Sequence, residues 1–499
     1  MNLLPPEHGA RRVVRDVASF ATSQYVQRFA NLIKGFVVAR VLGPSGNGLW
    51  QHFVLIIEYV QFTHGGALEG LNKQLARRVG AKDEAGARAT RDAGLGVTLA
   101  AAGTAWAALL VWLAFRWDTV APADRWGLPI VGAIALLDLV TNCYWAYLRA
   151  YARIALISSV GLVFALSNLV LGLALLPGFQ VLGLLVAWLF TRFVTTAWLV
   201  RRSGIPFSPR LDRTTVPGLI ATGFPIYLFN LSRLGLRNID RVLVDSVLDA
   251  SELGIYALAV TIAGLVRYGA DAVGFVVYPI FLRRFGEKND PRALAAQLAK
   301  PTLFLSIFVS IVLGFSVLVL HLPILWLLPD FVRSIEIFRL LTISTAFSCL
   351  AILPGFYLMA IDRQNWLVPL GFGTVAFNYF GGLRLIHDGH GLPGVAAAAA
   401  VGLGLYTTCV MLIAGRHAHG TWRAAVAWTA RMYAPLAYFA AATWAVHFGV
   451  GRVPALREWS ETGRALLEGG VFLLIALPVL FAFERRTQFI RNLRRREVT

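Results

Sequence analysis

The chain has 499 residues, of which 57% are hydrophobic and 15% charged, with a formal net charge of +19 and a mean hydropathy of +0.64. Soluble domains carry roughly 25% charged residues, so this composition excludes an ordinary soluble enzyme and predicts an all-α polytopic membrane protein. The basic residues are scattered over short connections, which excludes a nucleic-acid-binding face and follows the rule that cytoplasmic loops collect Lys and Arg.

Apolar segments long enough to cross a bilayer recur along the whole chain. Since a spanning helix needs about 20 residues, they predict about 14 transmembrane helices: 17–41, 47–68, 93–115, 127–149, 155–177, 180–200, 217–246, 253–280, 301–327, 335–360, 365–386, 391–415, 431–449 and 466–484. Basic runs occupy alternate connections, around 73–91, 201–213 and 283–292, and the tail 491–496. We therefore expect both termini in the cytoplasm. The polar first span predicts no cleaved signal peptide.

The second half of the chain repeats the first. Three pairs of segments match at an offset of roughly 210 residues, a fixed period that indicates duplication: 46–50 with 252–256, 148–153 with 358–363, and 181–187 with 392–398. An even number of spans separates the copies, so the halves share one orientation. We predict a six-helix lobe at 1–210, its parallel repeat at 211–420, and two extra helices with a basic tail at 421–499.

Three segments carry a resemblance to a known family: 39–50 (ARVLGPSGNGLW), 239–243 (IDRVL) and 253–259 (LGIYALA). They resemble polysaccharide-exporting members of the multidrug/oligosaccharidyl-lipid/polysaccharide (MOP) flippase superfamily. The resemblance implies two six-helix lobes in a V-shaped arrangement around a central cavity, with alternating access. It also implies export of undecaprenyl-pyrophosphate-linked oligosaccharide. The two extra C-terminal helices are similar to those of lipid II flippases, where such a pair adjoins a groove for the lipid tail.

Ionisable residues near the middle of spans are the candidate site residues, because a charge at bilayer depth costs about 2.5–3.5 kcal/mol and normally faces protein or water. In the first span Gln24, Gln27, Arg28, Asn31 and Lys34 recur at steps of three and four, which places them on one helical face. We expect this face to line the cavity, where Arg28 offers forked donors for phosphate oxygens. The alternative is hydrogen bonding between helices, with Lys34 snorkelling to an interface.

Three further arginines complete the predicted cationic cavity. Arg233 and Arg237 share a face of the seventh span, and Arg267 lies near the centre of the eighth, four residues before Asp271. We expect the arginines to bind a pyrophosphate, with Asp271 orienting Arg267; an i,i+4 ion pair alone is the other interpretation. Asp240 belongs to the motif at 239–243 and is expected to tie helix ends together.

Glu58, near the middle of the second span, could bind a coupling H+ or Na+. We favour the alternative, a salt bridge with Arg28 or Lys34, since buried charges are usually paired. No cofactor is expected. The segment 387–390 contains two histidines and an aspartate but too few converging ligands for a metal, and no nucleophile–base pair indicates an enzyme.

These features predict a flippase in the bacterial inner membrane that translocates an O-antigen or exopolysaccharide repeat unit linked to undecaprenyl pyrophosphate. A lipid II flippase, or a MATE-like cation/drug antiporter, is the alternative. Cation carriers rely on acidic residues, whereas the first span offers Arg28 and Lys34. The expected partners are the lipid-linked glycan, membrane lipids and polysaccharide-assembly proteins, with no nucleic acid. We expect the protein to act as a monomer.

Overall fold

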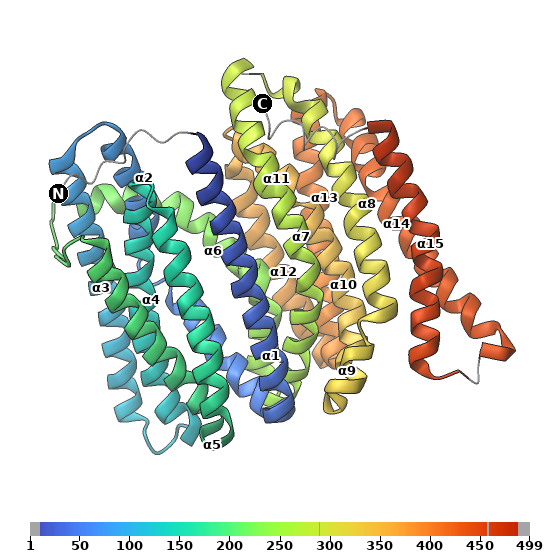
Figure 1. Ribbon diagram of the computed structural model, residues 1–499, viewed down its shortest axis with the longest axis horizontal. Helices are drawn as coiled ribbons and strands as arrows, with labels where there is room; N and C mark the ends of the chain where they lie inside the picture. Colours follow the sequence, from blue (N-terminus) through green and yellow to red (C-terminus); the bar gives the residue numbers. More distant parts are fainter. Residues whose placement is uncertain (1–9, 289, 457–458, 488–499) are drawn as a thin grey trace. The chain divides into compact units, whose positions relative to one another are not determined.

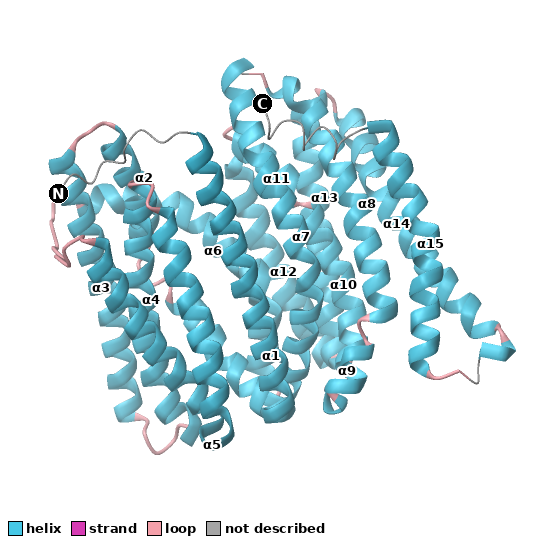
Figure 2. Ribbon diagram, viewed as in Figure 1, coloured by secondary structure: helices cyan, strands magenta, loops and turns pink. Residues whose placement is uncertain are grey.

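The computed structural model describes residues 10–288, 290–456 and 459–487. Within these ranges the chain is nearly all helix and contains no strand, as Figure 2 shows. Nine helices of the described chain are long and apolar enough to cross a membrane. The predicted all-α polytopic class is confirmed, while the count of about 14 spans stays a prediction. The basic tail 491–496, used to predict orientation, lies outside the described residues.

The helices follow one another with short connections (Figure 1). Their bounds are α1 Ala10–Val60, α2 Ala67–Gly80, α3 Glu84–Phe115, α4 Pro122–Ala150, α5 Ile154–Ser203, α6 Val216–Val247, α7 Ala250–Lys288, α8 Ala295–Val319, α9 Leu322–Leu327, α10 Ser334–Leu350, α11 Ile352–Ala360, α12 Leu367–His387, α13 Gly391–His419, α14 Trp422–Arg452 and α15 Glu461–Thr487. Short 3-10 turns cover Pro291–Leu294, Pro329–Phe331, Gln364–Trp366 and Pro454–Leu456.

Contacts divide the chain into two compact units, with the boundary between Leu231 and Ser232. The boundary therefore falls inside α6, so this helix begins in the N-terminal unit and ends in the C-terminal unit. The division into 1–210, 211–420 and 421–499 rests on sequence repetition and stays a prediction.

Two helices are too long for a single crossing. α1 has 51 residues and α5 has 50, which at 1.5 Å per residue gives about 75 Å, more than twice the hydrocarbon thickness. Each has a break in its helical geometry, at Gly43 with φ 66° and at Gln180 with φ 48°. The spans predicted at 17–41 and 47–68 lie mainly on either side of Gly43. Those predicted at 155–177 and 180–200 flank Gln180.

The basic connection expected around 73–91 is helical, which corrects the prediction of a loop there. α1 ends at Val60, and α2 follows as a short amphipathic helix. Leu71 and Leu75, one turn apart, are buried, while Lys73 and Arg77 are exposed. The hydropathy of a segment with this mixture is low even though one of its faces is apolar.

The start of α2 packs against α6 at backbone contact distance. A Cβ built on Gly70 would lie 2.0 Å from the carbonyl oxygen of Leu219, and one built on Gly223 would lie 1.9 Å from the carbonyl oxygen of Gly66. Only glycine permits this approach, as is common where membrane helices pack closely. Gln74 adds a hydrogen bond of 2.8 Å to a carbonyl oxygen of α6.

The segments matched at 148–153 and 358–363 form the same turn. Ala152 and Asp362 both adopt left-handed backbone conformations, with φ 53° and 57°. In each turn the N–H of the following arginine donates to a carbonyl oxygen five residues earlier, at 2.8 Å. The buried Tyr147 and Tyr357 each donate the hydroxyl to a backbone carbonyl 3.1 Å away. These two segments therefore repeat in structure as well as in sequence.

The two C-terminal helices α14 and α15 run beside α8 in the C-terminal unit (Figure 1). A buried apolar cluster joins the three helices, with Leu318 from α8, Phe439 from α14 and Phe472 from α15. Packing with α8 gives these two helices a fixed place in the unit.

Candidate functional site

Charged side chains from α6 and α7 gather in the C-terminal unit. Arg233 interacts electrostatically with Arg267, Tyr406, Arg237 and Asp271. Arg267 Nε lies 3.8 Å from Asp271 Oδ1, and their side chains are 33% and 39% exposed. The groups that act on Arg233 are thus two further guanidinium groups, the hydroxyl of Tyr406 and the carboxylate of Asp271. An arginine held this way presents planar N–H groups suited to phosphate or carboxylate oxygens.

Tyr406 on α13 is a member of this cluster that the sequence analysis missed. It interacts electrostatically with Arg233 and Arg267. A phenol donates one hydrogen bond, so the cluster offers a neutral donor between two cations. The signal in the sequence was weak, because an uncharged aromatic residue in the middle of a span is most often a packing residue.

Asp240 lies on α6, as Arg233 and Arg237 do, but its carboxylate is hydrogen-bonded to other residues. Its Oδ2 accepts a 2.8 Å hydrogen bond from the hydroxyl of Tyr256 on α7, and its Oδ1 accepts one of 2.8 Å from the backbone N–H of Arg241. The bond from Tyr256 ties α6 to α7, while the bond from Arg241 stays within α6.

Lys34 lies inside the N-terminal unit and is 8% exposed. Its Nζ donates to Asn168 Oδ1 at 2.5 Å and sits 5.0 Å from the centre of the Trp50 ring. Asn168 in turn donates to Thr191 Oγ1 at 3.1 Å. Lys34 thus forms the inter-helix hydrogen bond considered for it, between α1 and α5, and does not snorkel to an interface.

The other residues of the predicted first-span face differ in exposure. Arg28 is half-buried, with its guanidinium 5.9 Å from the Tyr25 ring, and Asn31 is exposed. Glu58 is half-buried. Of the two salt-bridge partners expected for Glu58, Lys34 is bound by an amide oxygen instead. The roles of Arg28, Asn31 and Lys34 in substrate binding stay predictions.

A buried ion pair that the sequence analysis missed joins α4 and α5. Arg192 pairs with Asp138, and their side chains are 12% and 7% exposed. Gln61 donates to Asp138 Oδ2 at 3.4 Å, and the Arg192 guanidinium lies 3.7 Å from the Phe164 ring centre. Both ions lie well inside the spans predicted at 127–149 and 180–200. The test applied to Arg28 would have identified them.

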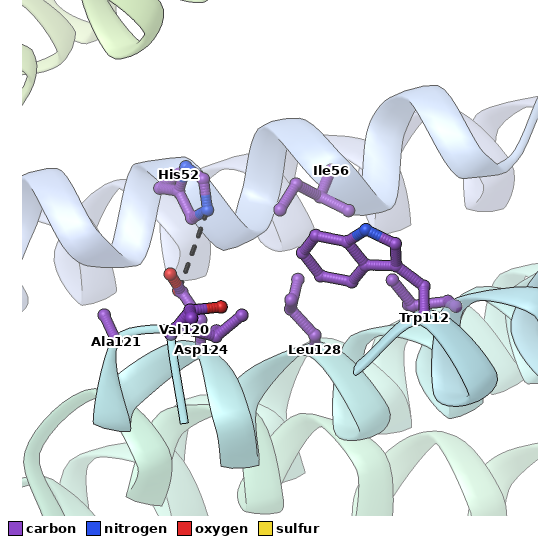
Figure 3. Close-up of a pocket in the computed structure, with 9 residues that line it drawn as sticks. His52, Ile56, Trp112, Val120, Ala121, Asp124 and Leu128 are labelled. Atoms are coloured by element: carbon purple, nitrogen blue, oxygen red, sulfur yellow. Dashed lines mark ion pairs between the residues drawn. The ribbon is translucent and has the colours of Figure 1, made fainter. Parts of the chain in front are cut away.

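A hollow of about 590 Å³ lies between α1, α3 and α4 (Figure 3). Its walls are mainly apolar, from Ile56, Trp112 and Leu128. His52 and Asp124 form an ion pair of 3.8 Å at one side of it. None of the predicted site residues lines this hollow, and its small polar surface does not match a cationic site.

In the part of the chain that the structure describes, no three His, Cys, Asp or Glu side chains converge as metal ligands would. In the segment 387–390, Asp388 instead pairs with Arg384 at 3.1 Å.

Comparison with known proteins identifies a matching sequence family and solved structures with a similar fold. The sequence profile of the family described as "Polysaccharide biosynthesis protein" matches residues 37–328. A multidrug resistance MATE family transporter of the MOP superfamily, in an inward-facing conformation, has a similar structure, with a TM-score of 0.68, 16% identity, and coverage of 79% of this chain and 95% of that one. A comparison with curated proteins finds no match.

Two further solved structures share the fold. One is an outward-facing MATE family transporter of the MOP superfamily, with a TM-score of 0.58, 17% identity, and coverage of 85% of this chain and 96% of that one. The other is a MOP superfamily transporter from Pyrococcus furiosus, described by the reverse polarity of its binding pocket, with a TM-score of 0.56, 17% identity, and coverage of 81% and 94%.

This protein is therefore a multi-pass α-helical membrane protein with the fold of MOP-superfamily transporters. More particularly, the chain belongs to the family of polysaccharide biosynthesis proteins, which its profile matches over more than half of its length. The resemblance predicted from the segments at 39–50, 239–243 and 253–259 is confirmed at this level.

Proposed function

We propose that the protein is a flippase that moves an undecaprenyl-pyrophosphate-linked oligosaccharide, the repeat unit of an O-antigen or exopolysaccharide, from the inner to the outer leaflet of the bacterial inner membrane. The observation that carries the proposal is the cluster of Arg233, Arg237 and Arg267 with Tyr406 in the C-terminal unit. Membership of a polysaccharide biosynthesis family supports a glycan as the cargo.

The charge of the cluster indicates the class of substrate. Three guanidinium groups in a membrane-spanning unit are costly without an anion or a water-filled space beside them. Arg267 is one-third exposed and can therefore be reached by a ligand. A pyrophosphate would replace water around the arginines with charge-assisted hydrogen bonds, while Asp271 holds the Arg267 fork in place. Tyr406 would donate an additional hydrogen bond to the same anion.

Two other substrates fit the fold. A lipid II flippase would handle the same polyprenyl pyrophosphate with a different sugar, and the arginine cluster suits both. A cation or drug antiporter would need a negative site, whereas this cluster is positive. The Pyrococcus furiosus transporter is described by reversed pocket polarity, so the polarity of a site, and not the fold, has to decide between substrates.

The test is mass spectrometry of polyprenyl-linked lipids in a strain that lacks the protein, complemented with wild type or with Arg233→Ala/Arg267→Ala. We expect a pyrophosphate-linked glycan to accumulate in the deletion strain and to clear only with wild type. A lost charged hydrogen bond is worth about 1.5–3 kcal/mol. Arg233→Ala alone or Arg267→Ala alone should therefore slow clearance about tenfold or more, and the two together at least as much.

Arg384→Ala is the matched control, because Arg384 lies in the same unit but is 78% exposed in a surface ion pair. It should clear the glycan as wild type does. An unchanged lipid pool in every strain would refute the glycan proposal and direct attention to export of cations. A peptidoglycan precursor as the accumulating lipid would select the lipid II alternative.

A further inference from the structure

A buried histidine–glutamate pair lies in the N-terminal unit, outside the proposed substrate site. His64 follows the end of α1 and Glu69 occupies the first turn of α2. Their side chains are 3% and 11% exposed, and His64 Nδ1 lies 3.5 Å from Glu69 Oε2. Two ionisable groups so close together and so well shielded from water require an account of where their protons are.

The hydrogen bonds around the pair leave one oxygen of Glu69 without a donor. The backbone N–H of Gly66 donates to His64 Nδ1 at 3.2 Å, so this nitrogen acts as an acceptor. A neutral histidine with an accepting Nδ1 carries its proton on Nε2. Glu69 Oε2, which faces Nδ1, is buried and receives no hydrogen bond in the described structure. Two acceptors therefore face each other, an arrangement that a single proton between them would turn into a hydrogen bond.

The surroundings favour the state that carries this proton. Asn230 on α6 donates to the other carboxylate oxygen of Glu69 at 3.3 Å. The ring of Phe62 stacks on His64 with 6.3 Å between centroids, and the ring of Tyr227 meets it edge-on at 6.0 Å. A neutral histidine beside a carboxylate has a net negative charge, which a buried aromatic environment disfavours. Adding a proton makes the pair neutral.

The nearby charges are few. Glu69 on α2 is the group whose charge acts on His64, and it also acts on the hydroxyl of Tyr227 on α6. On the side of α4, Asp138 is already paired with Arg192 of α5. No second cation is therefore needed to explain the site, and the proton is the positive charge that balances Glu69.

We propose that His64 and Glu69 form a proton-binding site, with one proton held between Nδ1 and Oε2. On binding, a proton from water forms an O–H bond at Glu69 Oε2, and this O–H shares the Nδ1 lone pair with the long 3.2 Å contact from the Gly66 N–H; on release the proton returns to water. Asn230 on α6 donates a hydrogen bond to Glu69, so its contact would change with the proton. Arg233 lies about one turn further along the same helix. The coupling of this proton to substrate movement rests on the proposed function, whereas proton binding itself does not.

The test uses the full-length protein with ¹⁵N-labelled histidine in lipid nanodiscs, followed by solid-state NMR between about pH 5 and about pH 9, the range in which histidine sites titrate. The His64 signals are assigned by their loss in His64→Gln. We expect the Nδ1 shift of His64 to change with pH in the wild type. Glu69→Gln places an amide donor where the proton would be, so this change should be lost in that near-isosteric variant.

Glu84→Gln, at the exposed start of α3, is the matched control and should keep the response of His64. Glu69→Ala serves as a second variant, which removes the carboxylate without supplying a donor and should also lose the response. A wild-type His64 that shows no change across this range, or the same response in Glu69→Gln as in wild type, would overturn the proposal. No glycan is present in this experiment, so its failure is distinct from failure of the flippase proposal.

Discussion

Removing either partner of the Arg192–Asp138 ion pair should destabilise the protein, and by unequal amounts. Arg192 is 12% exposed and stays charged at every accessible pH. In Asp138→Leu the guanidinium keeps the face of the Phe164 ring beside it but loses its carboxylate, and breaking a buried pair from this side costs about 3–5 kcal/mol. In Arg192→Leu the remaining carboxyl can take up a proton and keeps the hydrogen bond from Gln61. Its loss should cost less, about 1–3 kcal/mol.

The two variants should also differ in pH dependence. A buried carboxyl without its cation favours the protonated form, so the native state of Arg192→Leu binds more protons than the unfolded state, and its stability rises as the pH falls. Asp138→Leu has no such response at this site. The double variant Asp138→Leu/Arg192→Leu should lie within about 1 kcal/mol of wild type or above it, because apolar replacements of buried ion pairs are often neutral or stabilising.

The measurement is the free energy of unfolding of the purified protein in mixed micelles of SDS and a mild detergent, followed by tryptophan fluorescence at two pH values. Arg384→Leu, which removes an exposed arginine, is the control and should change stability by no more than about 0.5 kcal/mol. Equal costs for the two single variants, with a double variant equal to their sum, would mean that the two charges do not interact in a shielded environment. That result would refute the reasoning.

Three further predictions concern packing, a loop carboxylate and the repeated turns. Gly70→Ala would place a methyl group 2.0 Å from a carbonyl oxygen of α6 and should cost about 1–3 kcal/mol in the same unfolding assay; Gly103→Ala, which meets open space, should cost nothing. The pKa of Asp212 is lowered from 3.8 to about 2 by the hydroxyl three residues on and the N–H and hydroxyl two residues on. The stabilisation of the folded state by these hydrogen bonds to Asp212 is therefore present above about pH 4 and lost as the pH falls through 2. ¹³C NMR of the Asp212 carboxyl should show a titration midpoint near 2, and a midpoint near 3.8 would be the contrary result. Tyr147→Phe and Tyr357→Phe each remove the hydroxyl that donates to a backbone carbonyl beside the turn. The two substitutions should destabilise the protein by a similar amount, about 0.5–1.5 kcal/mol; very different costs would argue against equivalent turns.

Much of the fold could be predicted from local properties of the sequence. Runs of apolar residues predicted the all-α membrane class. Offset repeats predicted a duplication, and one matched pair, 148–153 and 358–363, falls on turns that are alike at Ala152 and Asp362. α2 was missed because its segment is too polar for a span and its apolar face becomes evident only when Leu71 and Leu75 are buried against neighbouring helices. Helix breaks at Gly43 and Gln180 were predicted only as span boundaries.

The candidate site was predicted in part. Arg233 and Arg267 were selected because each lies deep in a span, and Arg237 because it shares a helical face with Arg233. In the structure Arg237, Arg267 and Asp271 all act on Arg233. Tyr406 lies near the middle of α13 but could not be selected in the same way, since an uncharged side chain does not carry the free-energy cost of a charge at bilayer depth.

The sequence by itself determined the class of protein, the superfamily resemblance and the depth of each charge along its span, because hydropathy reports how far a residue lies from the ends of an apolar run. The tertiary structure alone decided which way those charges face and what they meet. Lys34 is buried in the N-terminal unit, where it hydrogen-bonds Asn168. Arg192 forms an ion pair with Asp138, and His64 lies against Glu69. The direction in which a side chain points from a membrane helix depends on the neighbouring helices that pack against it, and helices distant in sequence supply those neighbours.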